Sequence, residues 1–409
     1  MSVSIVFRND PQIALYDEFV RNHKEGSMFQ MSGWSTVKRE WKCLRIVGES
    51  DGNIVCAVQI LVRTFPFGKK LFYIPRGPLI SDEKYAKDFF AHIKKTAKEQ
   101  GAFCVKFDPN QVYRKHDAKG NVIEQQSDLL DHYLSLDKNI VHKGFDTPMS
   151  AYAQPRFNAV AQVSDDMEER FTNSAKRNIK IAVKKNVKVD VFFKEKLDSF
   201  AYLMELTEAR KGISLRNREY FQRFFDAFEG KTVFFMASID LADGIKNCDE
   251  SIHQLQSALA VAKKETNRVM EQRVQLENFI KEKEFFLEMQ MKYGGQTDIG
   301  GLLVLFHNNT AEYVYSGMNI EFSKYEPGYL VWSQAMEYAR TIGCEFVNFG
   351  GVNGDLNDRL WEFKRSLGAH VDEYIGEFDL IIQPLVYHLF ESVLPFAKKA
   401  VRKLKQLKK

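Results

Sequence analysis

The 409-residue sequence has few cysteines, and they are far apart. Cys43, Cys56, Cys104, Cys248 and Cys344 form no Cys-x-x-Cys motif. This distribution is typical of a protein in a reducing compartment, and it argues against a zinc site or a disulfide framework. We therefore expect no bound metal and no other cofactor.

Long hydrophobic runs are also missing. No window holds 18 consecutive apolar residues, so the sequence predicts no membrane-spanning helix. Arg8, Asn9 and Asp10 interrupt the apolar start of the chain, and no signal peptide is predicted. Together with the cysteine pattern, these absences predict a cytoplasmic protein.

The remaining composition is ordinary for a soluble globular protein, with 44% hydrophobic and 27% charged residues. The formal net charge of +4 makes the chain mildly basic, which by itself does not predict a nucleic-acid partner. A chain of 409 residues is long enough for two or three domains.

Two parts of the chain alternate strand and helix patterns in a similar order. The first is residues 1–145, and the second is residues 146–241 continued by residues 297–382. Their similarity predicts an α/β (α+β) fold with a duplicated domain, although no sequence repeat is visible.

Residues 242–296 differ from both halves, because they contain no proline and no glycine between Gly244 and Gly294. Apolar residues recur at helical spacing among many charged ones, which is typical of a coiled coil. Since strands flank this stretch on both sides, we expect a helical hairpin with its turn near Lys264–Arg268. A dimerisation device, a surface for an elongated partner such as RNA, and a merely solvated charged face remain open interpretations.

The C-terminal stretch Leu385–Lys409 has the pattern of an amphipathic helix, kinked at Pro395. Seven basic residues follow Phe396 with no acid among them: Lys398, Lys399, Arg402, Lys403, Lys405, Lys408 and Lys409. Such a helix can rest on anionic lipid at the inner face of a membrane. A helix packed on the first domain with a solvated basic tail is an equal alternative.

The most informative stretch is 344–368. Phe346, Val347 and Phe349 predict a short buried strand, and Gly350-Gly351 allows a sharp turn. An amphipathic turn of helix over Leu360–Leu367 then carries the pair Phe363-Lys364. Strand ends of this kind often hold ligands in α/β sheets. The alternative is a solvent-facing lysine on a surface helix.

Two further groups of side chains stand out. Trp34, Lys38 and Trp41 are spaced i, i+4, i+7, which predicts one shared helix face. A basic helix is expected over Asp166–Lys185, and its residues Lys176, Arg177 and Lys180 are candidates for phosphate contacts. For each group the alternative is an ordinary solvated face.

Several motifs together resemble the Fem transferases of Gram-positive bacteria (FemA, FemB and FemX, with MurM and MurN), which build the peptidoglycan interpeptide bridge. The resemblance covers nearly the whole chain, and it depends on the order and spacing of the motifs. They are Phe29-Gln30 with Trp34 and Lys38, Tyr73-Ile74-Pro75-Arg76-Gly77-Pro78, Lys106-Phe107-Asp108-Pro109, Arg177-Asn178-Ile179-Lys180, Thr207-Glu208-Ala209-Arg210-Lys211-Gly212, the helical insertion, and Phe349-Gly350-Gly351 through Leu360-Trp361-Glu362-Phe363-Lys364 to Gly376-Glu377-Phe378-Asp379.

The resemblance implies two GNAT-like acyltransferase subdomains with an inserted antiparallel coiled-coil arm over 242–296. The C-terminal helix, about 383–409, would join the first subdomain. The implied activity is transfer of Gly, Ala or Ser from aminoacyl-tRNA to the stem-peptide amine of lipid II or UDP-MurNAc-pentapeptide.

The resemblance also implies roles for residues on the acceptor side. Lys38 and Arg216 match cations on the diphosphate of the muropeptide, beside Trp34. A diphosphate suits two cationic donors from different directions, and lysine and arginine supply a point charge and a planar fork. Tyr220 and Tyr315 match tyrosines of the peptide groove.

Phe103 stands where one member has a groove tyrosine, a departure that removes a hydroxyl. Asp108 matches an aspartate near the reacting amine, and it could accept the amine's proton or simply end a strand before Pro109.

Phe363-Lys364 matches a Phe-Lys pair at the end of the aminoacyl channel. An ammonium there would stabilise the oxyanion of the tetrahedral intermediate by about 3–4 kcal/mol. No covalent intermediate is needed because the ester is already activated, and no clear Ser-His-Asp or Cys-His signature is present.

Two other functions remain as alternatives. An acyl-CoA-dependent N-acyltransferase is disfavoured, because Arg340-Thr341-Ile342-Gly343 is followed by Cys344-Glu345, which lacks the final small residue of the CoA loop. A non-enzymatic coiled-coil adaptor that binds RNA or a membrane is the third interpretation.

Overall fold

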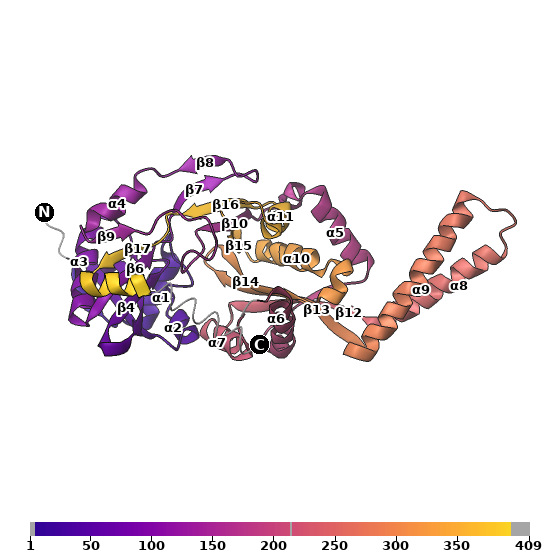
Figure 1. Ribbon diagram of the computed structural model, residues 1–409, viewed down its shortest axis with the longest axis horizontal. Coiled ribbons are helices and arrows are strands. Elements are labelled where there is room, and N and C mark those ends of the chain that lie inside the picture. The colour runs from indigo at the N-terminus through magenta and orange to yellow at the C-terminus, as the bar shows by residue number, and fades with distance from the viewer. Residues whose placement is uncertain (1–4, 213–214, 394–409) are drawn as a thin grey trace.

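The computed structural model describes residues 5–212 and 215–393 and shows two mixed β-sheets flanked by helices, with a long helical arm (Figure 1). The first sheet has the order β1 (Val6–Asn9), β2 (Lys42–Ser50), β3 (Asn53–Thr64), β4 (Lys70–Pro75), β6 (Ala102–Asp108), β17 (Phe378–Ile381), β9 (Ile140–His142), with β5 (Leu79–Ile80) on β3. We call this sheet and its helices the first lobe. The expected α/β fold is confirmed.

The second sheet, with its helices, forms the second lobe. Its order is β11 (Lys188–Phe192), β12 (Thr232–Asp240), β13 (Gln296–His307), β14 (Thr310–Met318), β15 (Phe346–Val352), β10 (Phe157–Gln162), β16 (His370–Tyr374), β7 (Val112–His116), β8 (Val122–Gln125). Among the described strands of this sheet, only β14 and β15 are paired in parallel, and that pairing is short.

The two lobes exchange strands. β7 and β8 come from the first third of the chain but extend the second sheet through β16, and β17 from the C-terminal part lies between β6 and β9 of the first sheet. The sheets therefore cross the expected boundaries at 145 and 382, and the division of the chain into domains stays a prediction.

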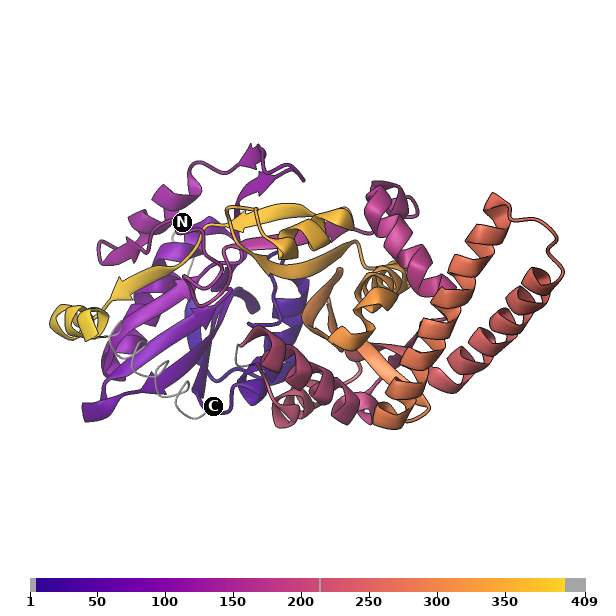
Figure 2. The same ribbon diagram turned by 45° about the vertical axis from the view of Figure 1, so that its right-hand side comes forward.

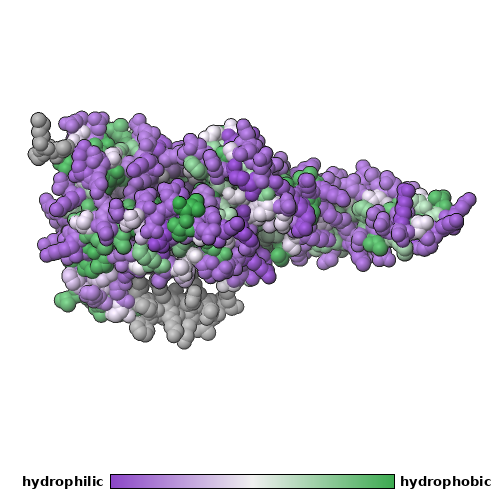
Figure 3. Space-filling model, turned by 90° about the horizontal axis from the view of Figure 1, so that it is seen from above, coloured by the Kyte–Doolittle hydropathy of each residue, from purple (hydrophilic) through white to green (hydrophobic). Residues whose placement is uncertain are grey.

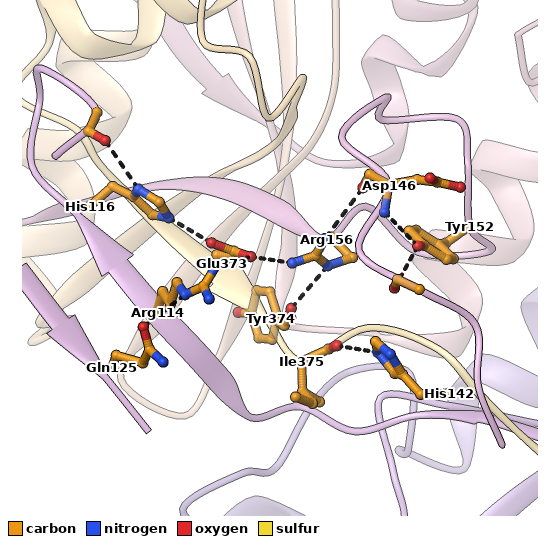
Figure 4. A network of polar contacts seen from close by, with 12 residues as sticks. Arg114, His116, Gln125, His142, Asp146, Tyr152, Arg156, Glu373, Tyr374 and Ile375 are labelled. Atoms are coloured by element: carbon orange, nitrogen blue, oxygen red, sulfur yellow. Dashed lines mark hydrogen bonds and ion pairs between the residues drawn. The ribbon is translucent and has the colours of Figure 1, made fainter. Parts of the chain in front are cut away.

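A polar network holds this exchange in place (Figure 4). Glu373 on β16 forms an ion pair with Arg156, and its other oxygen lies 2.7 Å from Nε2 of His116 on β7. Arg114, also on β7, lies 3.6 Å from Glu373, and Arg156 donates to the carbonyl oxygen of Tyr374 at 3.3 Å. Because Arg156 and Glu373 are both buried, either charge would destabilise the fold if its partner were missing.

Helices cover both faces of the second sheet (Figure 1). One face carries α5 (Asn173–Lys184) and α10 (Pro327–Thr341), and the opposite face carries α6 (Leu197–Lys211) and α7 (Arg218–Ala227). The core beneath α6 and α7 also contains side chains of the first lobe, including Tyr16 of α1 (Ile13–Asn22) and Trp34 of α2 (Gly33–Val37). The two lobes thus share this hydrophobic cluster, while each also has a core of its own. Three further helices are α3 (Ala86–Glu99), α4 (Leu129–Leu136) and α11 (Arg359–Ser366).

Two expected helices are shorter in the structure. α2 ends at Val37 and Lys38 is its C-cap, so Trp41 does not share a helix face with Trp34 and Lys38, and that prediction is wrong. The basic helix starts at Asn173 instead of Asp166, because Thr172 caps it by accepting from the backbone N–H of Ala175 at 3.2 Å.

The arm is an antiparallel hairpin of α8 (Leu241–Ala260) and α9 (Asn267–Tyr293) that projects from the second lobe (Figure 2). Their connection, residues 261–266, overlaps the expected turn, and Thr266 caps α9. The face of the arm seen in Figure 3 is mostly hydrophilic. At its base, Phe286 and Met289 pack into the core of the second lobe.

Residues 384–393 have helical backbone, and Phe390 of this segment packs on Phe65 and Phe103 of the first lobe with ring centroids 5.1 and 4.9 Å away. The expected kink at Pro395 and the basic residues after it lie outside the described residues. Within residues 5–212 and 215–393, no helix combines the length and apolar character needed to cross a bilayer.

Candidate active site

Three cations gather around two aromatic rings where α2 meets α7. Lys38 Nζ lies 5.2 Å from the centroid of the Trp34 ring. Cζ of Arg216 and Cζ of Arg223 lie 4.9 and 5.8 Å from the centroid of the Tyr220 ring. Within the described ranges 5–212 and 215–393, none of these three cations forms an ion pair with a carboxylate. We call Lys38, Arg216 and Arg223 the cation cluster.

The helices must approach closely to form this cluster. A Cβ atom on Gly33 would lie 2.4 Å from the carbonyl oxygen of Ala227, so only glycine lets α2 pack against the end of α7. Asn217 caps α7 by accepting from the N–H of Tyr220 at 3.2 Å, which fixes the start of the helix beside Arg216.

The cations of the cluster affect one another. Burial lowers the pKa of Lys38, the nearby positive charges of Arg216 and Arg223 lower it further, and the carboxylate of Glu40 opposes the change. Like charges held close together repel one another and raise the free energy of the site, so the arrangement favours a negatively charged ligand. Arg223 Nε is buried and has no hydrogen-bond partner among the described residues.

Tyr220 and Tyr315 form the wall beside the cation cluster. Their ring centroids are 5.9 Å apart in an edge-to-face arrangement, and Arg216 is close enough to Tyr315 on β14 to interact with it electrostatically. The structure therefore brings together five residues expected from the sequence: Trp34, Lys38, Arg216, Tyr220 and Tyr315. Arg223 was missed, although its position three residues after Tyr220 places it on the same face of a helix.

Lys364 is buried, with 3% of its surface exposed, and the alternative of a solvent-facing lysine is wrong. Asp358 caps α11 by accepting from Trp361 N–H at 2.8 Å, and this sets the helix against the end of β15. Lys364 Nζ donates to the carbonyl oxygens of Gly350 at 3.0 Å and Gly351 at 2.8 Å. An ammonium has three donors, so one N–H is left for another acceptor.

Burial lowers the pKa of Lys364 to about 7, Asp358 opposes this change, and the charge of Lys211 adds to it. Lys211 lies at the C-terminal end of α6. The amine can therefore exist in either protonation state near neutral pH.

Phe363, beside Lys364, belongs to an aromatic group with α10. Its ring lies edge-to-face with Tyr329 and Trp332, at centroid distances of 4.8 and 4.9 Å. Trp332 Nε1 donates to Ser316 Oγ on β14 at 3.3 Å. Because Ser316 follows Tyr315, this part of β14 contacts both the Phe363 group and the residues around the cation cluster.

Asp108 is 3% exposed at the end of β6. One carboxylate oxygen accepts from the Tyr73 hydroxyl at 2.8 Å, and the other accepts from the N–H of Arg76 at 2.6 Å. Burial raises the pKa of Asp108 to about 7, while Arg76 opposes the rise. These contacts fit a residue that holds the turn after the strand, and a role for Asp108 beside the reacting amine stays a prediction.

Phe103 does not fit the expected role in a substrate groove. Only 1% of its surface is exposed, since Phe65 and Phe390 cover its ring. The C-terminal helix therefore removes this side chain from any ligand, and we correct the prediction.

Lys176, Arg177 and Lys180 lie on α5, on the face of the second sheet opposite to α6 and α7. They do not join the cation cluster. Arg177 and Lys180 are exposed, and Lys176 donates weakly to the carbonyl oxygen of Glu169 at 3.4 Å.

Comparison with known proteins extends these observations. The lipid II:glycine glycyltransferase of Staphylococcus haemolyticus (strain JCSC1435) is 27% identical to this chain, with 95% of this chain and 96% of that protein covered. The lipid II:glycine glycyltransferase of Staphylococcus aureus is 26% identical over the same shares. A crystal structure of FemX superposes with a TM-score of 0.76 at 24% identity, over 94% of this chain and 100% of that chain. The sequence model of the FemAB family matches residues 13–394, so the chain belongs to the FemAB family.

Proposed function

We propose that this protein is an aminoacyltransferase that adds an amino acid from aminoacyl-tRNA to the stem-peptide amine of lipid II, in building the peptidoglycan interpeptide bridge. The observation that carries the proposal is the cation cluster, because it offers three cationic side chains around two aromatic rings with a single nearby carboxylate, Glu40, and none of the three forms an ion pair among the described residues. The names of the two staphylococcal relatives support lipid II as acceptor and glycine as the first amino acid to test.

On the acceptor side, the cation cluster would bind the diphosphate of lipid II. Arg216 and Arg223 present planar forks, and Lys38 presents a point charge from the other helix. UDP-MurNAc-pentapeptide carries the same diphosphate and could bind in the same way. Tyr220 and Tyr315 would line the path of the attached peptide.

On the donor side, the aminoacyl ester would lie beside Phe363 and Lys364. The aromatic group excludes water, and the third N–H of the Lys364 ammonium is free to donate to the carbonyl oxygen as negative charge develops. The amine attacks the ester carbon, the C–O bond to the tRNA ribose breaks, and an amide forms. The exposed cations Arg177 and Lys180 would contact tRNA phosphates elsewhere on the second lobe.

The C-terminal helix supports contact with an anionic membrane, where lipid II resides. Leu385, Leu389 and Val393 are exposed at i, i+4, i+8, while Phe390 faces the first lobe. Leu385 alone is 89% exposed. Apolar residues on the outer face suit insertion among lipid headgroups.

The hairpin between β3 and β4 adds Phe67, which is 99% exposed, to the same lobe. Lys69 Nζ donates to Gln383 Oε1 at 2.7 Å and ties this hairpin to the start of the helix. The hairpin tip therefore supplies a second apolar anchor for the membrane.

One experiment tests the activity. The protein is incubated with lipid II and charged tRNAs, and the product is weighed by mass spectrometry. We expect the mass of lipid II to rise by one aminoacyl residue. A product formed with acyl-CoA in place of charged tRNA would support the N-acyltransferase alternative, and RNA or membrane binding without any product would support the adaptor.

A further inference from the structure

β14 and β15 separate within the second sheet. They are paired in parallel at three positions, Thr310↔Phe346, Ala311↔Val347 and Glu312↔Asn348. Beyond Glu312, β14 continues to Met318 alongside β13, and beyond Asn348, β15 continues to Val352 alongside β10. We call the gap that opens after this last pair the fork.

Two side chains at the fork, those of Glu312 and Asn348, face the first lobe. Ala311, Val347 and Phe349 are buried in the core on the α10 face of the sheet. Since neighbouring side chains on a strand point to opposite faces, Glu312 and Asn348 point away from α10. Asn348 also accepts from the N–H of Gly350 at 2.8 Å, which supports the start of the glycine turn that holds Lys364.

The side chain of Glu312 meets three groups there. The Asn348 side chain lies beside it, and the Arg76 guanidinium and the Tyr374 hydroxyl are close enough to interact with it electrostatically. Arg76 is itself held in place, because its Nη2 donates to the carbonyl oxygen of Pro155 at 2.7 Å and its Cζ lies 3.9 Å from the centroid of the Tyr374 ring. Glu312 is therefore positioned by both lobes.

The Glu312 carboxyl is suited to exchange a proton near neutral pH. Burial raises its pKa to about 7, while the charge of Arg76 and the polar side chain of Asn348 oppose the rise. Among the described residues, Tyr374 also faces Glu312, and Arg76 in turn interacts with both Tyr374 and Asp108.

Glu312 is also better placed than Asp108 to meet a substrate. Both oxygens of Asp108 are occupied by Tyr73 and Arg76, and its surface is almost fully covered. Glu312 is only half-buried, and it lies on the β14 branch of the fork. Lys364 lies on the β15 branch, bound to carbonyl oxygens two and three residues beyond Asn348.

We propose that Glu312 accepts the proton of the attacking stem-peptide amine, a role that rests on the proposed aminoacyl transfer. As the amine nitrogen bonds to the ester carbon, one N–H proton passes to the Glu312 carboxylate, and the carbonyl oxygen becomes an oxyanion beside Lys364. The proton then moves to the ribose oxygen as the C–O bond breaks. The amide and the free ribose hydroxyl leave, and Glu312 is ionised again.

The test compares three variants in single-turnover transfer from charged tRNA to lipid II. Glu312→Gln should lower the transfer rate by about 10²–10⁴-fold, because the amide cannot accept the proton, while lipid II affinity stays within about twofold. Glu345→Gln is the matched control and should behave as wild type. Glu345 is an exposed glutamate directly before the first residue of β15. Asp108→Asn should mainly lower the melting temperature.

Glu312→Asp provides the conservative rescue, and it should recover part of the rate lost in Glu312→Gln even if the glutamine variant folds poorly. A folded Glu312→Gln that transfers within about threefold of the wild-type rate would overturn the assignment. A wild-type protein that makes no product with any charged tRNA would instead contradict the proposed function, and the role of Glu312 with it.

Discussion

Lys364 donates to the carbonyl oxygen of Gly351 at 2.8 Å, and this bond joins a buried amine to the end of a strand. Gly350, which accepts the second bond, has a φ of +77°, a conformation that glycine adopts without strain. The turn thus aims two backbone carbonyls at one ammonium and leaves its third N–H for a substrate.

Replacing Lys364 by methionine should abolish most of the transfer while the protein stays folded. Methionine fills a similar volume, but it cannot donate to the oxyanion, so we expect the rate to fall by about 10²–10³-fold. Single-turnover kinetics and a thermal melt measure the two effects. Arg365→Met, at an exposed position paired with Glu362, is the control, and a wild-type rate in Lys364→Met would refute the role.

Transfer should depend on pH as a bell centred near 7. The ionised form of Glu312 is needed on the acid side and the protonated form of Lys364 on the alkaline side, and both have a pKa of about 7. A rate profile from pH 5.5 to 9 shows the two limbs. Glu312→Gln should lose the acid limb and Lys364→Met the alkaline limb; unchanged limbs in both variants would exclude these groups from the reaction.

Stability should also respond to the pKa of Lys364. This pKa is lowered in the folded protein, from 10.5 to about 7, so between these values the unfolded chain binds more protons. The free energy of unfolding should therefore rise with pH through this window, relative to Lys364→Met, in which the contribution is absent. Urea titrations at pH 7 and pH 9 measure the difference, and equal pH dependence in both proteins would contradict the assignment.

Removing one cation of the cluster should weaken binding of lipid II. Hydrogen bonds to charged groups contribute about 1.5–3 kcal/mol, so Lys38→Ala, Arg216→Ala and Arg223→Ala should each raise Kd by roughly 10–150-fold. The loss should disappear with a muropeptide that lacks the diphosphate. Arg218→Ala on the same helix, where the arginine pairs with Asp198, is the control. Unchanged affinity in all three variants would place the diphosphate elsewhere.

Breaking the buried ion pair between Arg156 and Glu373 should destabilise the fold. Arg156→Ala leaves Glu373 buried with weaker partners, which costs about 3–5 kcal/mol. Arg340 forms surface ion pairs with Glu337 and Asp165, each of which contributes less than about 1 kcal/mol, so Arg340→Ala is the control. Urea denaturation compares them, and equal stability of the two variants would show that the network in Figure 4 does not hold the strand exchange.

Binding to anionic vesicles should require the apolar surface of the C-terminal helix and the hairpin tip. Leu389→Asp and Phe67→Asp each place a charge where an apolar side chain is exposed, so both should reduce co-sedimentation with vesicles that contain phosphatidylglycerol. Val261→Asp, at an exposed apolar site on the distant arm, is the control. Wild-type sedimentation of both variants would argue for a helix that only packs on the lobe.

The arm and most strands could be predicted from the sequence because their signals are local. The absence of proline and glycine over 245–293, with a 3.6-residue apolar period, is enough for two helices. The Phe363-Lys364 pair lies on α11 beside the end of β15. It was predicted in the same way, from a strand, a glycine turn and a short helix.

Other features depended on contacts between distant residues. The family resemblance implied a groove position for Phe103, but Phe390, nearly 290 residues later, covers its ring. Residues 112–125 look like part of the first lobe, but their strands extend the second sheet. Arg223 and Glu312 belong to no recognisable sequence motif. Their candidate roles follow only from their positions near Lys38 and Arg76 in the folded chain.

The sequence alone determined most of the helices and strands, where the arm leaves the body, and which residues belong to a FemAB-like pattern, since periodicity and turn chemistry act between near neighbours. Only the tertiary structure decided which charges are buried and which converge. The strand order and the exchange of strands between the lobes bring together side chains that are hundreds of residues apart in the sequence. Their burial brings the pKa values of Lys364 and Glu312 to about 7.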